Sequence, residues 1–358
     1  MSARLAVVLV NWNRWRDTIE CLESLLASSI GLKIIVVDNA SADQSTEHIL
    51  AWSRGEDIAN PASEAMSRFS TPPSPKPVSV QRLASADIPS NANAAAQVPK
   101  DEKSSGDRGQ HEIILVESDQ NLGFAGGNNL GIRLAMADRS VSYVWLLNND
   151  TVVATETPAN LLATLETTEN VGQCGTVVRY YHAPDTVQAL CGSRFQPITG
   201  RSWSLGAGTS VHDGFDPADI ASKCDFVLGA SLAVSRAFID RVGLMEESYF
   251  LYFEEIDWAI RNQRHSGGPL TTAFAANAVV WHKEGGTIGS SSKKNARSLL
   301  SEYWLTRSRI SFTVRYYKFY ILFHIIITIF YISRHLLQGR APAAANLTRA
   351  LFRRPFSH

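Results

Sequence analysis

The sequence has no net charge, few cysteines and no long apolar run near its start. Of its 358 residues, 34 are Lys or Arg and 34 are Asp or Glu, which disfavours a nucleic-acid binder that works through its overall charge. The four cysteines include no C-x-x-C pair, so a zinc ribbon and a disulfide framework are disfavoured and a reducing compartment fits better. The apolar run before Asn11 has only six residues, which is short for a signal peptide and typical of a first strand.

The common signatures of dinucleotide and phosphate-loop proteins are also missing. The Gly-rich segment NLGFAGGNNLG (121–131) is not G-x-G-x-x-G, and no Lys follows its glycines as in a phosphate loop. A hydride-transferring enzyme and a nucleotidyltransferase on a similar sheet are therefore disfavoured. Glycines let a backbone approach a ligand closely, although the segment is also typical of a tight turn before a helix.

The C-terminal region differs from the rest in charge and hydropathy. From Arg297 to the end the chain has ten Lys or Arg and one acid, Glu302, a net charge of +9. The same region contains FYILFHIIITIFYI (319–332), whose 14 residues are fewer than the roughly 20 that cross a bilayer. One interpretation is a helix lying in the headgroup layer of an anionic membrane, and the other is a helix packed on the protein body. We favour membrane contact because only His324 and Thr328 interrupt the apolar sequence, whereas a surface helix normally keeps a polar face.

A second shift in composition lies between residues 53 and 110. This segment holds seven of the 14 prolines and few large apolar side chains, so it cannot bury enough surface to offset its ordering entropy. We therefore predict a disordered insertion over residues 53–111 that divides the folded domain into two parts.

The remaining sequence alternates between predicted strands and helices. Apolar runs predict strands over residues 5–10, 33–37, 113–116 and 143–147. Helical spacing predicts helices over 18–27 and 129–137 and, with Ser41 as its N-cap, from residue 42. Such alternation indicates an α/β fold with a parallel sheet covered by helices on both faces. Ligands of such sheets bind beyond the carboxyl ends of the strands, where this sequence places Asn11, Asp38, Asn39, Glu117, Ser118 and residues 148–150.

Three further groups of residues have the chemistry of a catalytic site. Asp150 follows a strand and either suits a divalent cation that also holds a diphosphate or caps a turn. Glu254, Glu255 and Asp257 lie at the start of a predicted helix among aromatic residues, whose low dielectric raises a carboxylate pKa toward that of a general base. The helix dipole, and an ion pair of Asp257 with the arginine four residues later, also explain part of this cluster. His282 ends a predicted strand and is either a metal ligand or a solvated histidine.

Together these residues resemble the inverting family 2 glycosyltransferases, in particular the bacterial rhamnosyltransferase-type members that build cell-surface polysaccharides. Seven segments follow in the family's order: VVLVNWN (7–13), VVDNAS (36–41), NLGFAGGNNLG (121–131), LLNNDT (146–151), GAS (229–231), GLMEESYFLYFEEIDW (243–258) and VWHKEGGTIG (280–289). The resemblance covers residues 1–52 and 112–315 and implies the A-type nucleotide-sugar (GT-A) fold, a Rossmann-like α/β domain. We therefore expect that domain over 1–52 and 112–300, and a basic, apolar helical region that associates with a membrane over 301–358.

The resemblance also implies roles for individual side chains. The residues that it places around the nucleotide sugar are Val10, Asn11, Asp38, Asn39, Asn121, Gly123, Phe124, Asn129 and Asn149. Asp150 stands in the family's D-x-D motif, whose first acid is Asn148 here, and Asp150 and His282 are expected to hold Mg²⁺ or Mn²⁺. The family's acidic pair corresponds to Glu254 and Glu255, of which Glu255 is the expected catalytic base, with Asp257 as the second choice.

The implied activity is an inverting transfer of rhamnose or another hexose. The donor is a nucleoside-diphosphate sugar, dTDP-rhamnose or a UDP-sugar, and the acceptor is a hydroxyl of a cell-surface glycan or a lipid-linked molecule. The cation neutralises the leaving diphosphate while one carboxylate on the opposite face takes the acceptor proton. The expected location is cytoplasmic, peripheral at the inner face of the cell membrane. The alternative is a catalytically inactive protein of the same fold, which would bind the nucleotide sugar without transferring it.

Overall fold

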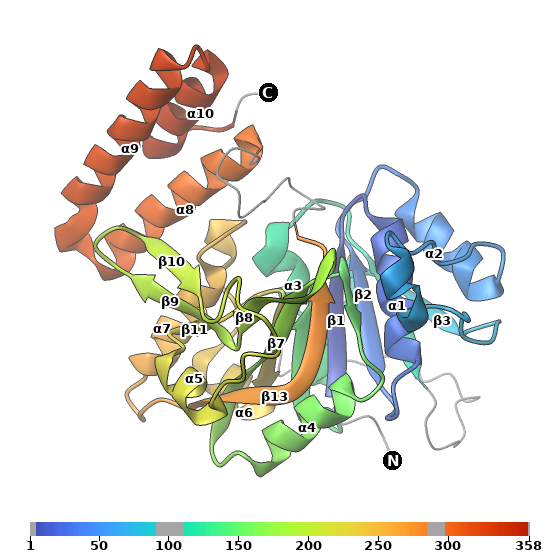
Figure 1. The fold of residues 1–358 in the computed structure, drawn as a ribbon. Helices are drawn as coiled ribbons and strands as arrows, with labels where there is room; N and C mark the ends of the chain where they lie inside the picture. Colours follow the sequence, from blue (N-terminus) through green and yellow to red (C-terminus); the bar gives the residue numbers. More distant parts are fainter. Residues whose placement is uncertain (1–4, 91–110, 285–297, 357–358) are drawn as a thin grey trace.

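The computed structural model describes residues 5–90, 111–284 and 298–356 (Figure 1). The strands of its main sheet are β1 (Leu5–Asn11), β2 (Lys33–Asp38), β3 (Val80–Ala84), β4 (Glu112–Glu117), β5 (Tyr143–Leu147), β6 (Thr151–Val153), β7 (Val171–Tyr180), β8 (Ala183–Leu190), β12 (Ser231–Ser235) and β13 (Thr271–His282). They form a ten-stranded sheet in the order β3-β4-β2-β1-β5-β12-β7-β13-β6, with β8 paired to β7.

The half of the sheet from β3 to β5 is parallel and brings the predicted strand ends together. β1 lies between β2 and β5 and is parallel to both. Asn11 is in register with Asp38, and Asp38 with Glu117, so these polar residues meet at one edge. β1 and β2 are apolar and almost wholly buried, as expected of parallel strands that are covered on both faces.

Helices cover both faces of the sheet. Alternate residues of β1 belong to two separate apolar clusters, because successive side chains of a strand point to opposite faces. One cluster contains side chains of α1 (Trp15–Leu26), α2 (Ser45–Arg54) and α4 (Thr157–Thr167). The other contains side chains of α3 (Gly123–Ala137), α6 (Arg236–Val242) and α7 (Glu254–Gln263). The predicted α/β class with a mainly parallel sheet is confirmed.

The second half of the sheet contains antiparallel strands that the alternation of strands and helices did not predict. β12 is antiparallel to both β5 and β7, and β13 runs parallel to β7 and antiparallel to the short strand β6. A second, three-stranded sheet consists of β10 (Arg201–Ser204), β9 (Gly192–Gln196) and β11 (Phe226–Val227), and the short helix α5 (Pro217–Lys223) lies between β10 and β11 in the chain. The pairing of β13 with β6 places His282 in register with Thr151, next to the strand-end residues.

The insertion differs from its prediction over the part that the structure describes. Residues 53–90 are not a disordered chain, since they contain β3 and two short 3₁₀ helices, η1 (Glu64–Phe69) and η2 (Ser85–Asp87). β3 pairs in parallel with β4, and Met66 of η1 is fully buried in an apolar cluster with Tyr181 and Trp281. The Ser74 amide and Lys76 Nζ also donate to Glu23 of α1, and Val78 packs against the apolar cluster of α1 and α2, so several contacts order this segment despite its prolines. Residues 91–110 lie outside the described part of the chain.

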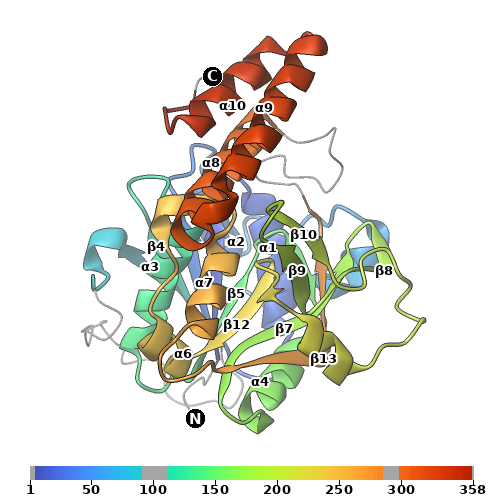
Figure 2. The ribbon, with the colours of Figure 1, turned by 90° about the vertical axis from the view of Figure 1, so that its left-hand side faces the viewer.

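Three C-terminal helices stand off one end of the α/β body (Figures 1 and 2). They are α8 (Leu299–Tyr316), α9 (Ile321–Leu337), which follows the short turn η4 (Lys318–Tyr320), and α10 (Ala341–Leu351). The predicted apolar segment of 14 residues is part of a longer helical stretch in the structure. This stretch, Lys318–Leu337, has 20 residues and is long and apolar enough to cross a membrane.

The polarity of α9 is inverted relative to that of a helix on the surface of a soluble domain. Its buried residues are His324, Thr328 and His335. Arg309 of α8 donates to Thr328 Oγ1 (2.6 Å). The exposed fractions of Leu322 and Phe330 are 67% and 64%. The two polar breaks in the apolar sequence therefore face the protein, and the apolar side chains face outward.

Candidate active site

A connected set of polar side chains closes the carboxyl ends of β1 and β2. The Asn11 amide donates to Asp38 Oδ1 (2.7 Å) and to Ser41 Oγ (3.1 Å). Thr18 Oγ1 donates to Asn11 Oδ1 (2.8 Å) and accepts from the Asn149 amide (2.9 Å). The structure thus brings together three of the residues predicted to contact the nucleotide, Asn11, Asp38 and Asn149.

Ser41 has a different role from the predicted one. Its hydroxyl donates to Asp38 Oδ1 (2.7 Å), and α2 begins only at Ser45. The expectation that Ser41 caps this helix is therefore wrong, because the serine is held by the strand-end network instead. Ser41 and Thr18 are site residues that helix patterns alone did not identify.

Asn39, directly after β2, bonds the tight turn that connects β4 to α3. Asn39 Nδ2 donates to Asn121 Oδ1 (3.0 Å) and to the Gly123 carbonyl (3.1 Å), and its Oδ1 accepts from the Leu122 amide (2.9 Å). Gly123 adopts φ +72°, and a Cβ there would collide with the Phe250 carbonyl oxygen, so this position requires glycine. The Gly-rich segment therefore begins α3, six residues before the predicted helix start, and it contacts the loop that precedes α7.

The remaining residues predicted around the nucleotide have contacts within the protein. The half-buried side chain of Val10 lies against Gly127 of α3, where a Cβ would approach it to 2.9 Å. The Phe124 amide donates to the Phe250 carbonyl (2.8 Å). Asn129 is buried, and its side chain bonds both the carbonyl (2.9 Å) and the amide (3.0 Å) of Met245. Asn129 thus fastens the segment before α7 onto α3, and we assign it to positioning rather than to donor contact.

Asp150 and His282, predicted as metal ligands, face each other. Asp150 Oδ1 lies 3.1 Å from His282 Nε2. Gln188 Oε1 lies 2.9 Å from His282 Nδ1 and accepts its proton, which directs Nε2 toward Asp150. Burial alone would raise the pKa of Asp150, but the adjacent imidazole lowers it overall. Burial likewise opposes protonation of His282, but the Asp150 carboxylate raises its pKa.

The donor atoms of this pair fit Mg²⁺ or Mn²⁺. A carboxylate oxygen and an imidazole nitrogen converge, and both side chains are almost fully buried. The Asn148 amide lies 3.4 Å from His282 Nε2, at the position of the missing first acid. Residues 5–90, 111–284 and 298–356 contain no group of three or more His, Cys, Asp or Glu side chains that could hold a metal ion. Further ligands would have to be diphosphate oxygens and water, which Mg²⁺ commonly keeps.

Lys283, which the sequence did not single out, anchors this pair to α1. Its Nζ lies 2.5 Å from Asp17 Oδ1 and 2.6 Å from Glu20 Oε2. Its backbone amide donates to the Asp150 carbonyl (3.0 Å). The Tyr181 hydroxyl donates to the other oxygen of Glu20 (2.5 Å). The end of β13 is therefore held by Asp150 on one side and by α1 on the other. The contacts of Lys283 with α1 join residues more than 260 positions apart in the sequence.

The predicted base, Glu255, lies at the start of α7, after a strained turn. Phe250, Tyr252 and Phe253 adopt φ values of +62°, +66° and +74°, a conformation that is unfavourable for bulky residues. The Glu255 carboxylate accepts hydrogen bonds from its own amide and from the Gly229 amide. Burial outweighs these bonds and raises the pKa of Glu255 to about 7. A Cβ at Gly229 would collide with the carboxylate, so glycine permits this approach.

Glu254, beside it, has a different environment. Its side chain is buried, and Oε2 has no hydrogen-bond partner within the described part of the chain. Burial and the neighbouring Glu255 raise the pKa of Glu254 well above its ordinary value. The two neighbouring carboxyl groups therefore differ in their contacts, since Glu255 accepts backbone hydrogen bonds at Gly229 and Oε2 of Glu254 has no partner in the described part of the chain.

Two adjacent residues connect Glu255 to the loop that carries Asp150. The Gly229 amide donates to Glu255, and the Ala230 carbonyl accepts from the Asn148 amide (3.0 Å). The segment 229–231 is indicated by sequence only through the family resemblance. In the structure it contacts both the predicted base and the loop that carries Asp150.

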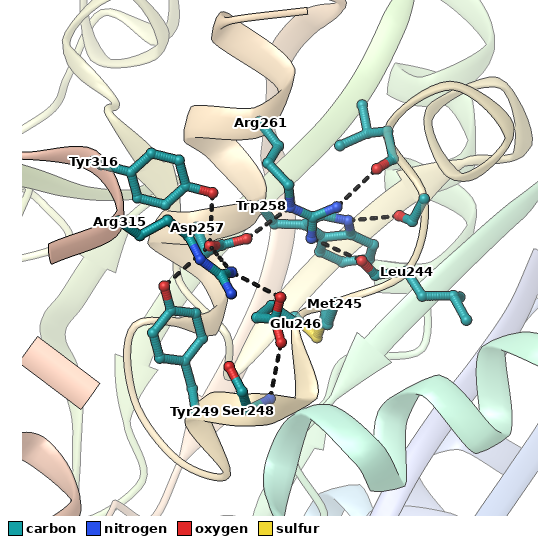
Figure 3. Close-up of polar contacts among 12 residues, drawn as sticks. Leu244, Met245, Glu246, Ser248, Tyr249, Asp257, Trp258, Arg261, Arg315 and Tyr316 are labelled. Atoms are coloured by element: carbon teal, nitrogen blue, oxygen red, sulfur yellow. Dashed lines mark hydrogen bonds and ion pairs between the residues drawn. The ribbon is translucent and has the colours of Figure 1, made fainter. Parts of the chain in front are cut away.

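Asp257, the second choice for the base, is the centre of a polar cluster instead (Figure 3). Its side chain is fully buried, and Oδ1 accepts from Arg261 Nε (2.7 Å). Oδ2 accepts from Tyr249 (3.1 Å), Tyr316 (2.8 Å) and Arg315 (3.2 Å). Arg315 and Tyr316 belong to α8, so Asp257 joins α7 to the C-terminal helices. A carboxylate with these four donors is poorly placed to accept a substrate proton.

Two sequence comparisons find likenesses to known proteins. Residues 92–200 match the family model described as Glycosyl transferase family 2. A curated relative, the low-salt glycan biosynthesis hexosyltransferase Agl10 of Haloferax volcanii, is 25% identical over 162 residues, which are 43% of this chain and 48% of the relative. The chain thus spans about half the length of that relative.

Three solved structures show a distant likeness to the chain. The mannosyltransferase PcManGT from Pyrobaculum calidifontis, in complex with GDP-Man and Mn²⁺, is 13% identical with a TM-score of 0.47, over 98% of this chain and 86% of that one. GalNAc-T7 with UDP, GalNAc and Mn²⁺ is 13% identical with a TM-score of 0.47, over 86% and 47% of the two chains. S. aureus TarS 1–349 is 11% identical with a TM-score of 0.43, over 86% and 64%.

The family match covers one part of the described fold. The matched segment contains β4, α3, β5 and the Asn148–Asp150 loop, which supply part of the strand-end site. The sheet is mainly parallel and covered by helices on both faces. Residues 92–200 are therefore similar to the glycosyltransferase family 2 model, within an α/β fold that has a mainly parallel sheet.

Proposed function

We propose that this protein is an inverting hexosyltransferase that uses a nucleoside-diphosphate sugar as donor and a glycan or lipid-linked hydroxyl as acceptor. The observation that carries the proposal is the Glu255 carboxylate. Its pKa of about 7 lies near the pH at which a general base works best, and the segment that holds it also holds the Asp150 loop.

The donor side of the proposal rests on the strand-end network. Asp38 ends β2 and Asn39 follows it, so both would lie beside the base and ribose, while Asp150 and His282 would hold Mg²⁺ or Mn²⁺ at the diphosphate. When bound, the cation supplies positive charge that stabilises the leaving diphosphate. Lys283 fixes His282 and Asp150 relative to α1, so that these side chains are oriented before the donor arrives.

The acceptor side of the proposal rests on Glu255. Its carboxylate takes the proton of the acceptor hydroxyl as the oxygen attacks the anomeric carbon opposite the leaving diphosphate. The glycosidic bond forms as the bond to the diphosphate breaks, so the anomeric configuration inverts. One carboxylate suffices because no covalent sugar–enzyme intermediate is formed. Rhamnose, named by the family resemblance, is one candidate among the hexoses.

A donor screen tests this proposal. Nucleoside-diphosphate sugars, including dTDP-rhamnose and UDP-hexoses, are added to the full chain with and without Mn²⁺, and the thermal unfolding midpoint is recorded. A true donor raises the midpoint, and does so more with Mn²⁺. The Glu255→Gln variant is expected to show the same donor-induced rise in the unfolding midpoint but no sugar transfer. If the wild-type chain binds a donor and transfers no sugar to any hydroxyl acceptor, the alternative of a catalytically inactive binding protein is correct.

We further propose that the C-terminal helices hold the protein on an anionic membrane, so that it acts at the inner face of the cell membrane. The support is the inverted polarity of α9, whose apolar side chains face outward, and the net charge of +9 from Arg297 onward. A lipid-linked acceptor is consistent with this placement.

Vesicle sedimentation tests the membrane proposal. Leu322→Ser/Phe330→Ser, on the outward side of α9, is expected to reduce pelleting with anionic vesicles. The matched control Ile58→Ser/Trp203→Ser removes two exposed apolar side chains of the α/β body and its small sheet, and it leaves pelleting unchanged. Substitution is preferable to truncation before Arg315, because truncation also removes the α8 partners of Asp257. Equal pelleting of all three proteins would refute membrane binding through α9.

A further inference from the structure

A pocket of about 370 Å³ lies between the α/β body and the C-terminal helices. It contains none of the strand-end residues of the candidate active site. Ser248 of the short turn η3 (Glu247–Tyr249) lines one side, and Arg307, Ser311 and Arg315 of α8 line another. Arg353, which follows α10, completes the lining, so the pocket exists only because the body and the helices meet there.

The pocket is strongly basic. Three arginines line it, and no carboxylate does. Arg315 is already paired with Glu246 (2.7 Å) and Asp257 (3.2 Å). Neither Arg307 nor Arg353 has a carboxylate within ion-pair distance among residues 5–90, 111–284 and 298–356. Arg307 donates one bond, to the Tyr303 hydroxyl (3.0 Å), of the five N–H donors that a guanidinium carries.

We propose that this pocket binds the phosphate group of a membrane amphiphile. Guanidinium groups match phosphate oxygens in a bidentate geometry, and two serine hydroxyls add neutral donors beside them. The three arginines disfavour a cationic ligand, and the lining also includes the apolar side chain of Val314 and the ring of Tyr249. The proposal rests on the proposed function only in placing the chain at a membrane.

The surroundings of the pocket favour an amphiphile over a free phosphate. Val314, which is 48% exposed, lines the pocket between Ser311 and Arg315. Phe352, which is 68% exposed, directly precedes Arg353. The apolar stretch Lys318–Leu337 begins three residues after Arg315. Basic donors bordered by exposed apolar side chains match a molecule with a phosphate head and an apolar tail.

Paired variants of equal charge test the pocket. Arg307→Gln/Arg353→Gln removes two lining charges, and Arg334→Gln/Arg340→Gln removes two charges from the same helical region outside the pocket. Binding of the full chain to phosphatidylglycerol vesicles, with phosphatidylcholine vesicles as reference, is measured by sedimentation. The pocket pair is expected to lose about tenfold more affinity than the control pair, because it also loses hydrogen bonds to a charged group. Equal losses would mean general surface attraction and would overturn the proposal.

A second arm separates the two sources of phosphate. The thermal unfolding midpoint of the wild-type chain is recorded with inorganic phosphate and with short-chain phosphatidylglycerol at equal concentration and ionic strength. A larger rise with the lipid, lost in Arg353→Gln, supports the proposal. An equal rise with inorganic phosphate overturns the assignment to a membrane amphiphile. Arg353 follows the last helix, so its single variant keeps the test usable if the double variant fails to fold.

The two proposals fail separately in these experiments. If no nucleotide sugar stabilises the wild-type chain but the pocket pair still loses vesicle affinity, the transferase function is wrong and the pocket stands. If donors stabilise the chain normally and both charge pairs bind vesicles alike, the pocket is wrong and the transferase function stands.

Discussion

Glu255→Gln is the most informative substitution, because it is expected to change stability and activity in opposite directions. Burial raises the Glu255 pKa from 4.5 to about 7, a difference that corresponds to about 3 kcal/mol. The folded protein holds this proton more tightly than the unfolded chain. The group therefore stabilises the fold fully below pH 4.5, and this contribution is lost as the pH rises through 7.

The glutamine variant has no such pH dependence at this position. The free energy of unfolding of the variant minus that of the wild type is expected to rise by about 3 kcal/mol between pH 4.5 and pH 8. Urea unfolding followed by circular dichroism at half-unit pH steps measures this difference. Over the same range, wild-type transfer increases with one apparent pKa near 7, and the variant loses activity by about 10²-fold or more.

Glu169→Gln is the control, since Glu169 is an exposed glutamate in the turn after α4. Its unfolding free energy should follow the wild type at every pH. A difference between Glu255→Gln and wild type that stays constant with pH would refute the argument that burial shifts this carboxyl group. A variant with wild-type transfer rates would refute its assignment as the base.

Three other predictions concern Gly229, Asp257 and the pair of Asp150 and His282. Gly229→Ala places a Cβ against the carboxylate, so we expect kcat to fall at least about tenfold while donor-induced thermal stabilisation is kept; an unchanged kcat would contradict the role of this glycine. Asp257→Asn leaves Arg261 without its charge partner, so the free energy of unfolding, measured in urea, should fall by about 3 kcal/mol. A fall below about 1 kcal/mol would show that the cluster does not support the fold. Excess EDTA should abolish transfer and the Mn²⁺-dependent part of the donor-induced shift, with recovery on adding Mn²⁺ or Mg²⁺; full activity in EDTA would contradict the assignment of Asp150 and His282.

The parts of the site that sequence predicts are those at strand ends. An apolar run of five or six residues followed by a polar residue indicates where a parallel strand stops, and parallel strands stop at the same edge. Asn11, Asp38 and Asn149 could therefore be expected to meet, and they do. The start of α7 at Glu254 follows similarly from local acids and aromatic residues.

The parts that sequence does not predict depend on contacts between distant segments. Lys283 reaches α1 across more than 260 residues, and no local pattern indicates which acid it pairs with. From sequence, Asp257 is the second choice for the base and also a candidate ion-pair partner of Arg261, and its additional contact with Arg315 of α8 can be seen only in the structure. Composition also fails to predict the order in residues 53–90, because that order depends on a few specific contacts: the pairing of β3 with β4, the burial of Met66 and Ile88, and hydrogen bonds to Glu23.

The hydrogen bonds around Asp257 connect α7 directly to α8, so that the two helices are not joined by a flexible linker alone. Arg315 and Tyr316 bond Asp257 of α7, whose second residue is the proposed base Glu255, and α9 begins only five residues after Tyr316. If α9 lies on a bilayer, the Glu255 carboxylate stands at one fixed height above the lipid. Acceptors would then be sorted by length, because only a molecule that presents its hydroxyl at that height can react, whatever its sugar composition.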